Sequence, residues 1–176
     1  MADSQQADEA SAAPPPTEFR PPPLSFTDAE GREIAVRRAT DPVDALAAMY
    51  DEYEPEERAQ GLPPLRAPDR RDWIEDLLAS GLNLVAWHGD RAVGHAALLP
   101  YDDTAELVIF VHPDYQQVGI GSRLIRALLA AGQADGIGHV WLSVQRDNHV
   151  AMNLYRSVGF ETTNRDRLEH EMERSL

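Results

Sequence analysis

The feature that most constrains the fold is a strand–helix–strand unit between residues 104 and 146. TAELVIFVHP (104–113) is an apolar run rich in β-branched residues, and HVWLSVQR (139–146) alternates apolar and polar residues. Between them, SRLIRALLAAGQADG (122–136) carries apolar residues at helical spacing. A helix that returns the chain between two strands of one sheet places those strands parallel. The unit therefore predicts an α/β fold with at least one parallel strand pair.

The rest of the chain adds strands that hairpins connect and that are therefore expected to be antiparallel. Gly89-Asp90 lies between two apolar runs and predicts a tight turn. We expect strands at 33–39, 82–88, 91–100 and 165–173, and helices at 42–53, 70–80 and 147–160, with Asp41 as N-cap of the first helix and Gly81 as C′ residue of the second. The prediction is a mixed, mostly antiparallel sheet flanked by helices, and not a doubly wound sheet.

The chain is long enough for one domain, which we place at residues 31–176. Residues 1–30 are acidic and rich in proline and alanine, with few bulky apolar groups. Such a segment cannot bury enough apolar surface to offset the entropy lost on ordering, so we predict a disordered tail.

Charge excludes several classes of partner. The 16 basic residues, all arginine, stand against 30 acidic ones, which gives a net charge of -14. A chain this acidic repels nucleic acid and anionic membrane, so neither is expected as a partner. The acidity has two interpretations that the sequence leaves open. One is adaptation to a high-salt cytoplasm, and the other is a GC-rich genome combined with an acidic tail.

Targeting and redox signals are lacking in the sequence. It contains no apolar run of about 18 residues, and its N-terminus does not resemble a secretory signal. The absence of cysteine excludes disulfides and thiolate nucleophiles, and it is compatible with the cytoplasmic location that we expect. The six histidines show no metal-binding spacing, so no metal site is predicted.

Gly119 and Gly121 precede the predicted helix at 122–136 and suggest a phosphate-binding loop. A P-loop needs a lysine, which this chain lacks. A dinucleotide fingerprint needs a third glycine where Leu124 stands. What remains is a helix N-terminus whose free N–H groups and positive dipole end attract an anion. Arg123 and Arg126 either add a cationic contact or are solvated helix residues.

Two motifs resemble the GNAT N-acetyltransferase superfamily. Gln116 to Gly121 reads Q-x-x-G-x-G and is similar to that family's acetyl-CoA pyrophosphate loop, and the strand before it resembles the family's central strand. The second signature, N-x-x-A-x-x-L-Y-x-x-x-G-F, is met by Asn148, Ala151, Leu154, Tyr155, Gly159 and Phe160. The resemblance spans roughly residues 33 to 173, and it implies that the parallel strands splay apart around acetyl-CoA.

The resemblance also implies which residues contact the acetyl donor. Backbone groups of Phe110 and Val111 would pair with the pantetheine and the acetyl carbonyl. Asn148 would lie near the sulfur, although it can equally serve as a helix N-cap. The pyrophosphate would bind the backbone amides of the loop, namely Gln116, Gln117, Val118, Gly119, Ile120, Gly121 and Ser122.

Acetyl transfer to an amine needs a base for the amine and an acid for the leaving thiolate. Tyr155 matches the family position of the acid, and its alternative role is that of a core aromatic residue. Glu106, at the start of the central strand, is the candidate base, and desolvation on a half-buried strand would raise its pKa. Its alternative role is that of a salt-bridged glutamate or an edge glutamate. His95 is a second candidate base or a satisfied core residue, and His112 is expected to be structural.

The acceptor side is less defined. Glu54, Glu56 and Glu57 are expected either to attract a cationic amine or to form a solvated acidic run. Trp73, Trp87 and Trp141 fall on apolar faces and are predicted in the core. MYDEYEPEERAQGLPPL and GHAALLPYDDTAELVIFV look similar to GNAT protein-lysine acetyltransferases.

The sequence analysis thus predicts an acetyl-CoA-dependent N-acetyltransferase that works by direct transfer to a primary amine of a small molecule or a protein, as a monomer or homodimer. The alternative is a non-catalytic acyl-CoA-binding sensor.

Overall fold

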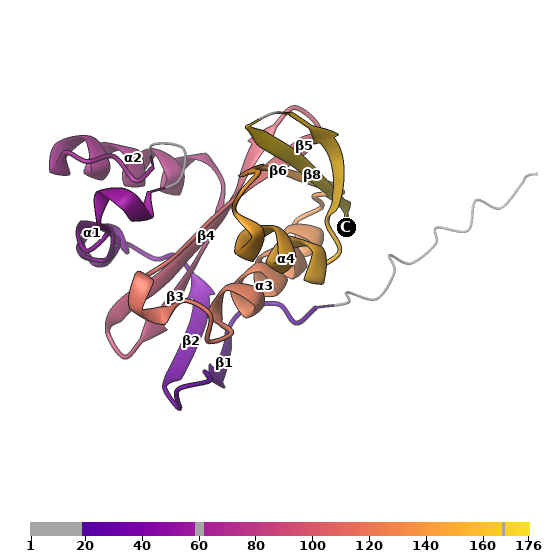
Figure 1. Cartoon of the computed structure of the whole chain (residues 1–176). Helices are drawn as coiled ribbons and strands as arrows, with labels where there is room; N and C mark the ends of the chain where they lie inside the picture. The colour runs from indigo at the N-terminus through magenta and orange to yellow at the C-terminus, as the bar shows by residue number, and fades with distance from the viewer. Residues whose placement is uncertain (1–18, 59–61, 167) are drawn as a thin grey trace, which may run out of the picture.

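The computed structural model describes residues 19–58, 62–166 and 168–176. The described chain forms one sheet of eight strands in the order β1-β2-β3-β4-β5-β6-β8-β7. The elements, in chain order, are β1 (Leu24–Thr27), β2 (Glu33–Arg38), α1 (Val43–Asp51), η1 (Pro55–Glu57), α2 (Ala67–Ser80), β3 (Leu82–His88), β4 (Arg91–Tyr101), β5 (Thr104–Val111), η2 (Pro113–Tyr115), α3 (Ile120–Ala134), β6 (His139–Gln145), α4 (His149–Ser157), β7 (Glu161–Arg165) and β8 (Glu169–Ser175). Figure 1 shows their arrangement.

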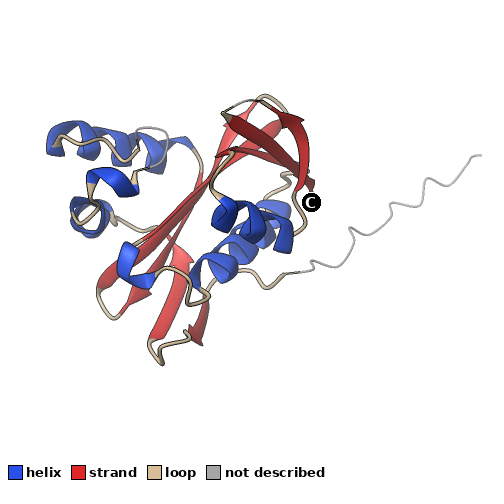
Figure 2. Ribbon diagram, viewed as in Figure 1, coloured by secondary structure: helices blue, strands red, loops and turns tan. Residues whose placement is uncertain are grey.

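Helices cover the sheet on both faces, with α1 and α2 on one side and α3 and α4 on the other (Figures 1 and 2). The apolar residues of α3 at 124, 125, 128 and 129 are buried against alternate residues of the strands. A second, smaller cluster lies under α1 and α2, around Leu46, Tyr50 and Ile74. The two apolar clusters fix the sheet between two helical layers.

The parallel pair is β5 and β6, as the sequence predicts, but the two strands are paired only at their beginnings. Ala105 pairs with Val140 and Glu106 with Trp141, and no later residues of the two strands are paired. On its other edge β6 pairs with β8 along its whole length, and β5 pairs likewise with β4. Beyond Glu106 the two strands therefore splay apart and leave a gap within the sheet.

The first described segment of the chain differs from the prediction. Within the segment assigned to the tail, Leu24–Thr27 forms β1, an edge strand antiparallel to β2. The side chains of Leu24 and Phe26 alternate toward the main core, and Phe19 packs there too. Two or three apolar side chains were enough to order a segment whose average composition is that of a tail. Residues 1–18 lie outside the described part of the chain.

The C-terminal region also differs, because the single strand expected at 165–173 is a hairpin of β7 and β8. The polar run ETTNR of β7 has one exposed edge and gave no alternating apolar signal.

The predicted helix caps need correction as well. Asp41 makes no cap hydrogen bond and the N-cap of α1 is Pro42, while Gly81 is extended rather than left-handed. A Cβ on Gly81 would lie 2.1 Å from the carbonyl oxygen of Leu98, so the glycine is needed for close packing against β4.

No helix in the described part of the chain is both long and apolar enough to cross a membrane.

Candidate active site

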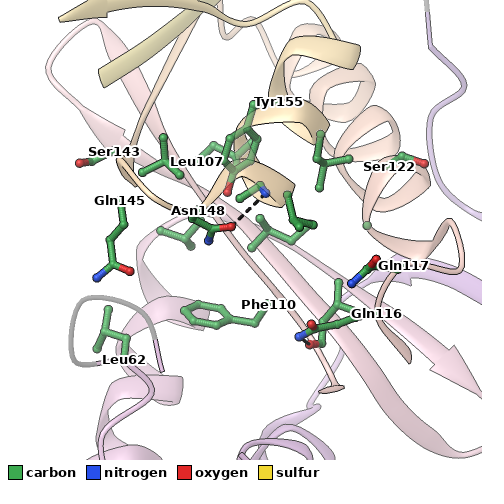
Figure 3. Close-up of a pocket in the computed structure, with 18 of the residues that line it drawn as sticks. Leu62, Leu107, Phe110, Gln116, Gln117, Ser122, Ser143, Gln145, Asn148 and Tyr155 are labelled. Carbon is green, nitrogen blue, oxygen red and sulfur yellow. Dashed lines mark hydrogen bonds between the residues drawn. The ribbon is translucent and has the colours of Figure 1, made fainter. Parts of the chain in front are cut away.

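A cavity of about 550 Å³ occupies the gap between β5 and β6. Its walls are β5 from Glu106 onward, the glycine loop with the start of α3, the end of β6, and α4 (Figure 3). Ten of the twelve site residues chosen from the sequence line it: Glu106, Phe110, Val111, Gln116, Gln117, Gly119, Gly121, Ser122, Asn148 and Tyr155. The splayed strands thus bring together residues that are up to 49 positions apart in the sequence.

The other two predicted residues lie outside the cavity lining. Ile120 is fully buried in the main core, and the side chain of Val118 packs against that core. Arg123 and Arg126 do not line the cavity either. The guanidinium of Arg123 lies over the ring of Phe26 and donates a hydrogen bond to the Gly119 carbonyl at 3.1 Å, so it braces the loop from outside.

The glycine loop has the backbone of an anion cradle. Gln117 and Gly119 have positive φ angles of 59° and 92°, and Gly119 is the left-handed N-cap of α3. This conformation turns successive peptide groups at the helix N-terminus, where the first N–H groups have no partner within the helix. A Cβ on Gly121 would lie 3.3 Å from the side chain of Leu154, so glycine keeps the α3–α4 contact close beside the cavity.

The ladder with β4 decides which backbone groups of β5 face the gap. The N–H of His112 donates to the carbonyl of Val93 at 2.9 Å, and in an antiparallel ladder such pairs recur at every second residue. The backbone of Phe110 is therefore directed at His95 of β4. The backbone groups of Phe110 therefore do not face the gap, and this corrects the prediction that they pair with the pantetheine or the acetyl carbonyl. The gap-facing backbone groups belong to Leu107, Ile109 and Val111, and strand alternation was the signal that could have identified the first two.

The Val111 carbonyl already has two donors within the protein. The Tyr53 hydroxyl donates to it at 2.6 Å and the Gln116 side-chain amide at 3.0 Å. Of the two backbone groups of Val111, the N–H is the one left for a ligand. The side chain of Phe110 faces the cavity in Figure 3 and also packs edge-on against Tyr50 and Trp73.

Glu106 lies at the apex of the gap, where β5 and β6 separate. Within the described part of the chain, it is the one charged residue that lines the cavity. It is half-buried, and this burial raises the pKa of its carboxyl. A carboxylate with a raised pKa is a better base than an exposed one.

Tyr155, on α4, is 9% exposed, and its hydroxyl points into the cavity (Figure 3). Burial raises the pKa of the phenol to about 12, which keeps the hydroxyl protonated and able to donate. Beside it, Asn148 is the N-cap of α4, and its Oδ1 accepts a hydrogen bond from the Ala151 N–H at 3.1 Å. The side-chain NH2 of Asn148 is left to face the cavity (Figure 3), so both roles considered for this residue are compatible.

His95 is not in the cavity. It is 1% exposed and contacts the Tyr50 hydroxyl through Nδ1 at 2.8 Å and the Asn83 Oδ1 through Nε2 at 2.9 Å. Burial lowers its pKa to about 4, so it is a neutral, satisfied core residue and not a base. His112 is also buried, with Nδ1 accepting from the Asp114 N–H, which agrees with the structural role expected for it.

The acidic residues between the first two helices do not line the cavity. Glu54 and Glu57 cap η1 reciprocally, and both are exposed, as is Glu56. These positions favour the interpretation of Glu54, Glu56 and Glu57 as a solvated acidic run.

Two of the three tryptophans, Trp73 and Trp87, pack against the cluster under α1 and α2, as predicted.

Trp141 differs from the expectation, because it lies outside both apolar clusters and stacks edge-on against Tyr101. Alternation of β6 gives the reason. Val140 and Leu142 occupy the core face and Trp141 the opposite one, together with Ser143 and Gln145, two cavity residues that the sequence analysis missed. The described residues contain no group of three or more side chains suited to hold a metal.

The comparison with protein families decides the assignment. Residues 45–160 match the family described as the acetyltransferase (GNAT) family. The chain belongs to the GNAT family. GNAT members use acetyl-CoA as acetyl donor, and the family assignment supports an acetyl-CoA-dependent N-acetyltransferase, as the sequence predicted.

Two named relatives agree with this assignment. The N-alpha-acetyltransferase RimI of Mycobacterium tuberculosis is 42% identical over 82 residues, which are 47% of this chain and 48% of the relative, so the match spans about half of that protein. The [ribosomal protein bS18]-alanine N-acetyltransferase of Escherichia coli is 31% identical over 114 residues, 61% of this chain and 71% of the relative.

Solved GNAT structures confirm the fold. The GNAT domain of PAT from S. lividans superimposes with a TM-score of 0.75 at 19% identity, over 87% of this chain and 96% of that one. The PaiA N-acetyltransferase from Thermoplasma acidophilum, solved in complex with coenzyme A, gives a TM-score of 0.68 at 21% identity, over 81% and 99% of the two chains. At this identity the likeness concerns the fold alone.

Proposed function

We propose that this GNAT protein transfers an acetyl group from acetyl-CoA directly to the α-amine of a protein N-terminus. The observation that carries the proposal is the cavity at the splay of β5 and β6, which holds Glu106, Tyr155, Asn148 and the glycine loop together. The choice of acceptor follows the names of the two relatives, one an N-alpha-acetyltransferase and the other an alanine N-acetyltransferase of a ribosomal protein.

The residues present fit an acetyl-CoA molecule. The apolar, gap-facing edge of β5 suits the pantetheine arm, because backbone groups of Leu107, Ile109 and Val111, among them the Val111 N–H, face the gap. The loop from Gln116 to Ser122 suits the pyrophosphate, because its amides attract an anion without any cationic side chain. The bound donor would supply an acetyl thioester at the apex of the gap, near Glu106 and Tyr155.

The two ionisable residues have distinct roles in the proposal. Glu106 accepts a proton from the acceptor amine, directly or through water, so that the nitrogen lone pair can form the new C–N bond. As the C–S bond breaks, Tyr155 donates its phenolic proton to the departing thiolate. Asn148 holds the sulfur end of the donor through its side-chain NH2. The described lining includes the hydroxyls of Ser122 and Ser143, which donate to the Gly119 carbonyl and to Glu169, but no cysteine and no histidine that could activate a serine. Direct transfer without an acyl-enzyme intermediate is therefore the proposed route.

The acceptor enters on the side of Leu62, Gln145 and Ser143, opposite the glycine loop (Figure 3). Among the described residues that line the cavity, only Glu106 is charged, so it also attracts the ammonium form of the amine before deprotonation. We further propose that the protein acts in the cytoplasm as a monomer or homodimer, without nucleic acid as a partner. Its net charge of -14 supports the last point.

An acceptor panel tests the assignment. It compares a lysine-free peptide with a free N-terminus, the same peptide with a blocked N-terminus, a blocked peptide with one lysine, and a small primary amine. The proposal predicts thiol release from acetyl-CoA with the first peptide, and mass spectrometry should place the acetyl group on its α-amine. Transfer to the lysine side chain or the small amine alone would reassign the acceptor. Tight CoA binding without turnover on any acceptor would favour the sensor instead.

A further inference from the structure

The turn between β1 and β2 is a rigid unit. The Gly31 N–H donates to the Asp28 carbonyl at 3.1 Å, and the side chain of Asp28 is fully buried. That carboxylate accepts the backbone N–H groups of Glu30 and Arg32, both at 2.9 Å, and the Nε of Arg32 at 2.7 Å. A short turn with this many internal hydrogen bonds keeps one conformation.

This turn packs against the segment that leads into α3, with one contact to the glycine loop and two to η2 just before it. The Ala29 N–H donates to the Val118 carbonyl at 3.1 Å, and Nη1 of Arg32 donates to the Asp114 carbonyl at 3.3 Å. The guanidinium of Arg32 also lies 4.0 Å from the ring centroid of Tyr115. Residues near the N-terminus thus contact the loop that precedes α3, about 85 positions further along the chain.

The contact at Val118 fixes the direction of a peptide group. In a trans peptide the carbonyl of one residue and the N–H of the next point in opposite directions. Because the Val118 carbonyl is held by the Ala29 N–H, the N–H of Gly119 points away from the β1–β2 turn, and Gly119 itself lines the cavity. This N–H is one of the groups on which an anion at the loop would depend.

We propose that the β1–β2 turn is a positioning device that orients the Val118–Gly119 peptide for the donor's pyrophosphate. The inference rests on the proposed role of the glycine loop. It gives Ala29 and Arg32 a part in donor affinity although neither lines the cavity. In a chain without lysine, the orientation of backbone N–H groups replaces the cationic side chain that would otherwise hold a phosphate.

Ala29→Pro tests the inference because it deletes a single backbone donor. Ala29 occupies the second position of the four-residue turn Asp28–Gly31, where proline is well tolerated. Ala29→Ser is the matched control, since it keeps the N–H and the side chain is exposed. The measurements are the dissociation constant of CoA by calorimetry, the KM for acetyl-CoA, kcat, and the thermal unfolding midpoint.

We expect Ala29→Pro to weaken CoA binding and raise the KM for acetyl-CoA by about tenfold, with kcat and the unfolding midpoint close to wild type. Ala29→Ser should behave as wild type. Equal CoA affinity of Ala29→Pro and Ala29→Ser would overturn the inference and leave the proposed function intact. A wild-type protein that binds no CoA would overturn both.

If Ala29→Pro unfolds, Arg32→Lys decides the question. Lysine keeps a cation beside Asp28 but loses the reach to the Asp114 carbonyl and the flat contact with Tyr115. The inference predicts CoA binding weakened by about threefold with unchanged kcat. A folded Arg32→Lys protein with wild-type CoA affinity would overturn it.

Discussion

At the residue scale, the account depends on two side chains, Glu106 and Tyr155, whose pKa values burial raises. Burial raises the pKa of the Glu106 carboxyl, and a base acts only when deprotonated. The rate should therefore increase with pH through this raised pKa and become level above it. We expect Glu106→Gln to lower kcat by about 10²- to 10⁴-fold and to lose this part of the pH profile.

The stability effect of Glu106→Gln has a definite sign and serves as the control. Because the pKa is raised in the folded state, the carboxyl contributes stability at low pH and loses that contribution as pH increases through the folded pKa. The side-chain amide of the Glu106→Gln variant does not titrate, so its contribution to stability does not fall as pH increases. A variant less stable than wild type at neutral pH, measured by thermal unfolding, would show that the carboxylate has a structural partner instead.

Tyr155→Phe removes only the proton donor, because the ring stays packed beside Phe160. We predict a decrease in kcat of about 10²- to 10⁴-fold with unchanged CoA affinity. The pH dependence that Glu106 produces should remain, since a phenol with a pKa of about 12 stays protonated across that range. Steady-state kinetics at several pH values measure both. Undiminished turnover would remove Tyr155 from the mechanism.

His95 predicts acid sensitivity of the fold. Burial lowers its pKa to about 4 from the ordinary 6.5, so the neutral imidazole stabilises the folded state above pH 6.5. This contribution, about 3 kcal/mol, is lost as pH falls from 6.5 toward 4. Denaturant unfolding at pH 7 and pH 4.5 should show a smaller pH dependence for His95→Gln than for wild type. An equal loss in both proteins would assign the acid sensitivity to other groups.

At the element scale, a glycine allows the end of α2 to approach β4. A Cβ on Gly81 would contact backbone atoms of Leu98, which cannot move aside as a flexible side chain would. Gly81→Ala is therefore expected to destabilise the fold by about 2–3 kcal/mol. Gly138→Ala is the control, because a Cβ at Gly138 meets no atom within 4 Å. Equal unfolding free energies for the two variants would contradict the packing argument.

The elements that the sequence predicts well are those with a strong local signal. The turn at Gly89-Asp90 and the amphipathic helix after Gly121 were predicted from periodicity and turn residues alone. β1 and β7 were missed because their stability comes from pairing with β2 and β8, a non-local contact that no window of sequence contains.

The site residues also divide into those with a signal in the sequence and those without one. Glu106 and Tyr155 were found by motif and strand position, and the cavity brings them together. Ser143 and Gln145 were missed because they carry no motif, and only the splay of β6 from β5 exposes them. The backbone role given to Phe110 failed for a related reason, since one residue of register decides which edge of a strand its N–H faces.

At the scale of the whole molecule, the question is how a chain with a net charge of -14 stays folded. Several arginines pair with acids across elements, such as Arg38 with Asp135 and Arg91 with Glu52, yet acids outnumber them almost two to one. Salt screens the remaining repulsion. If the acidity is a halophilic adaptation, the unfolding midpoint should increase between low and molar KCl. No increase would favour the genomic explanation of the acidity.

The central claim is that the loop at the start of α3 holds the pyrophosphate of the acetyl donor, and one substitution tests it through charge. Ser122 lines the cavity in the first turn of α3, where an aspartate favours the helix and preserves the fold. Ser122→Asn is the neutral control of similar size. Calorimetric titration with CoA should show affinity lower by about tenfold or more for Ser122→Asp, and close to wild type for Ser122→Asn. Equal CoA affinity of the two variants would contradict the account.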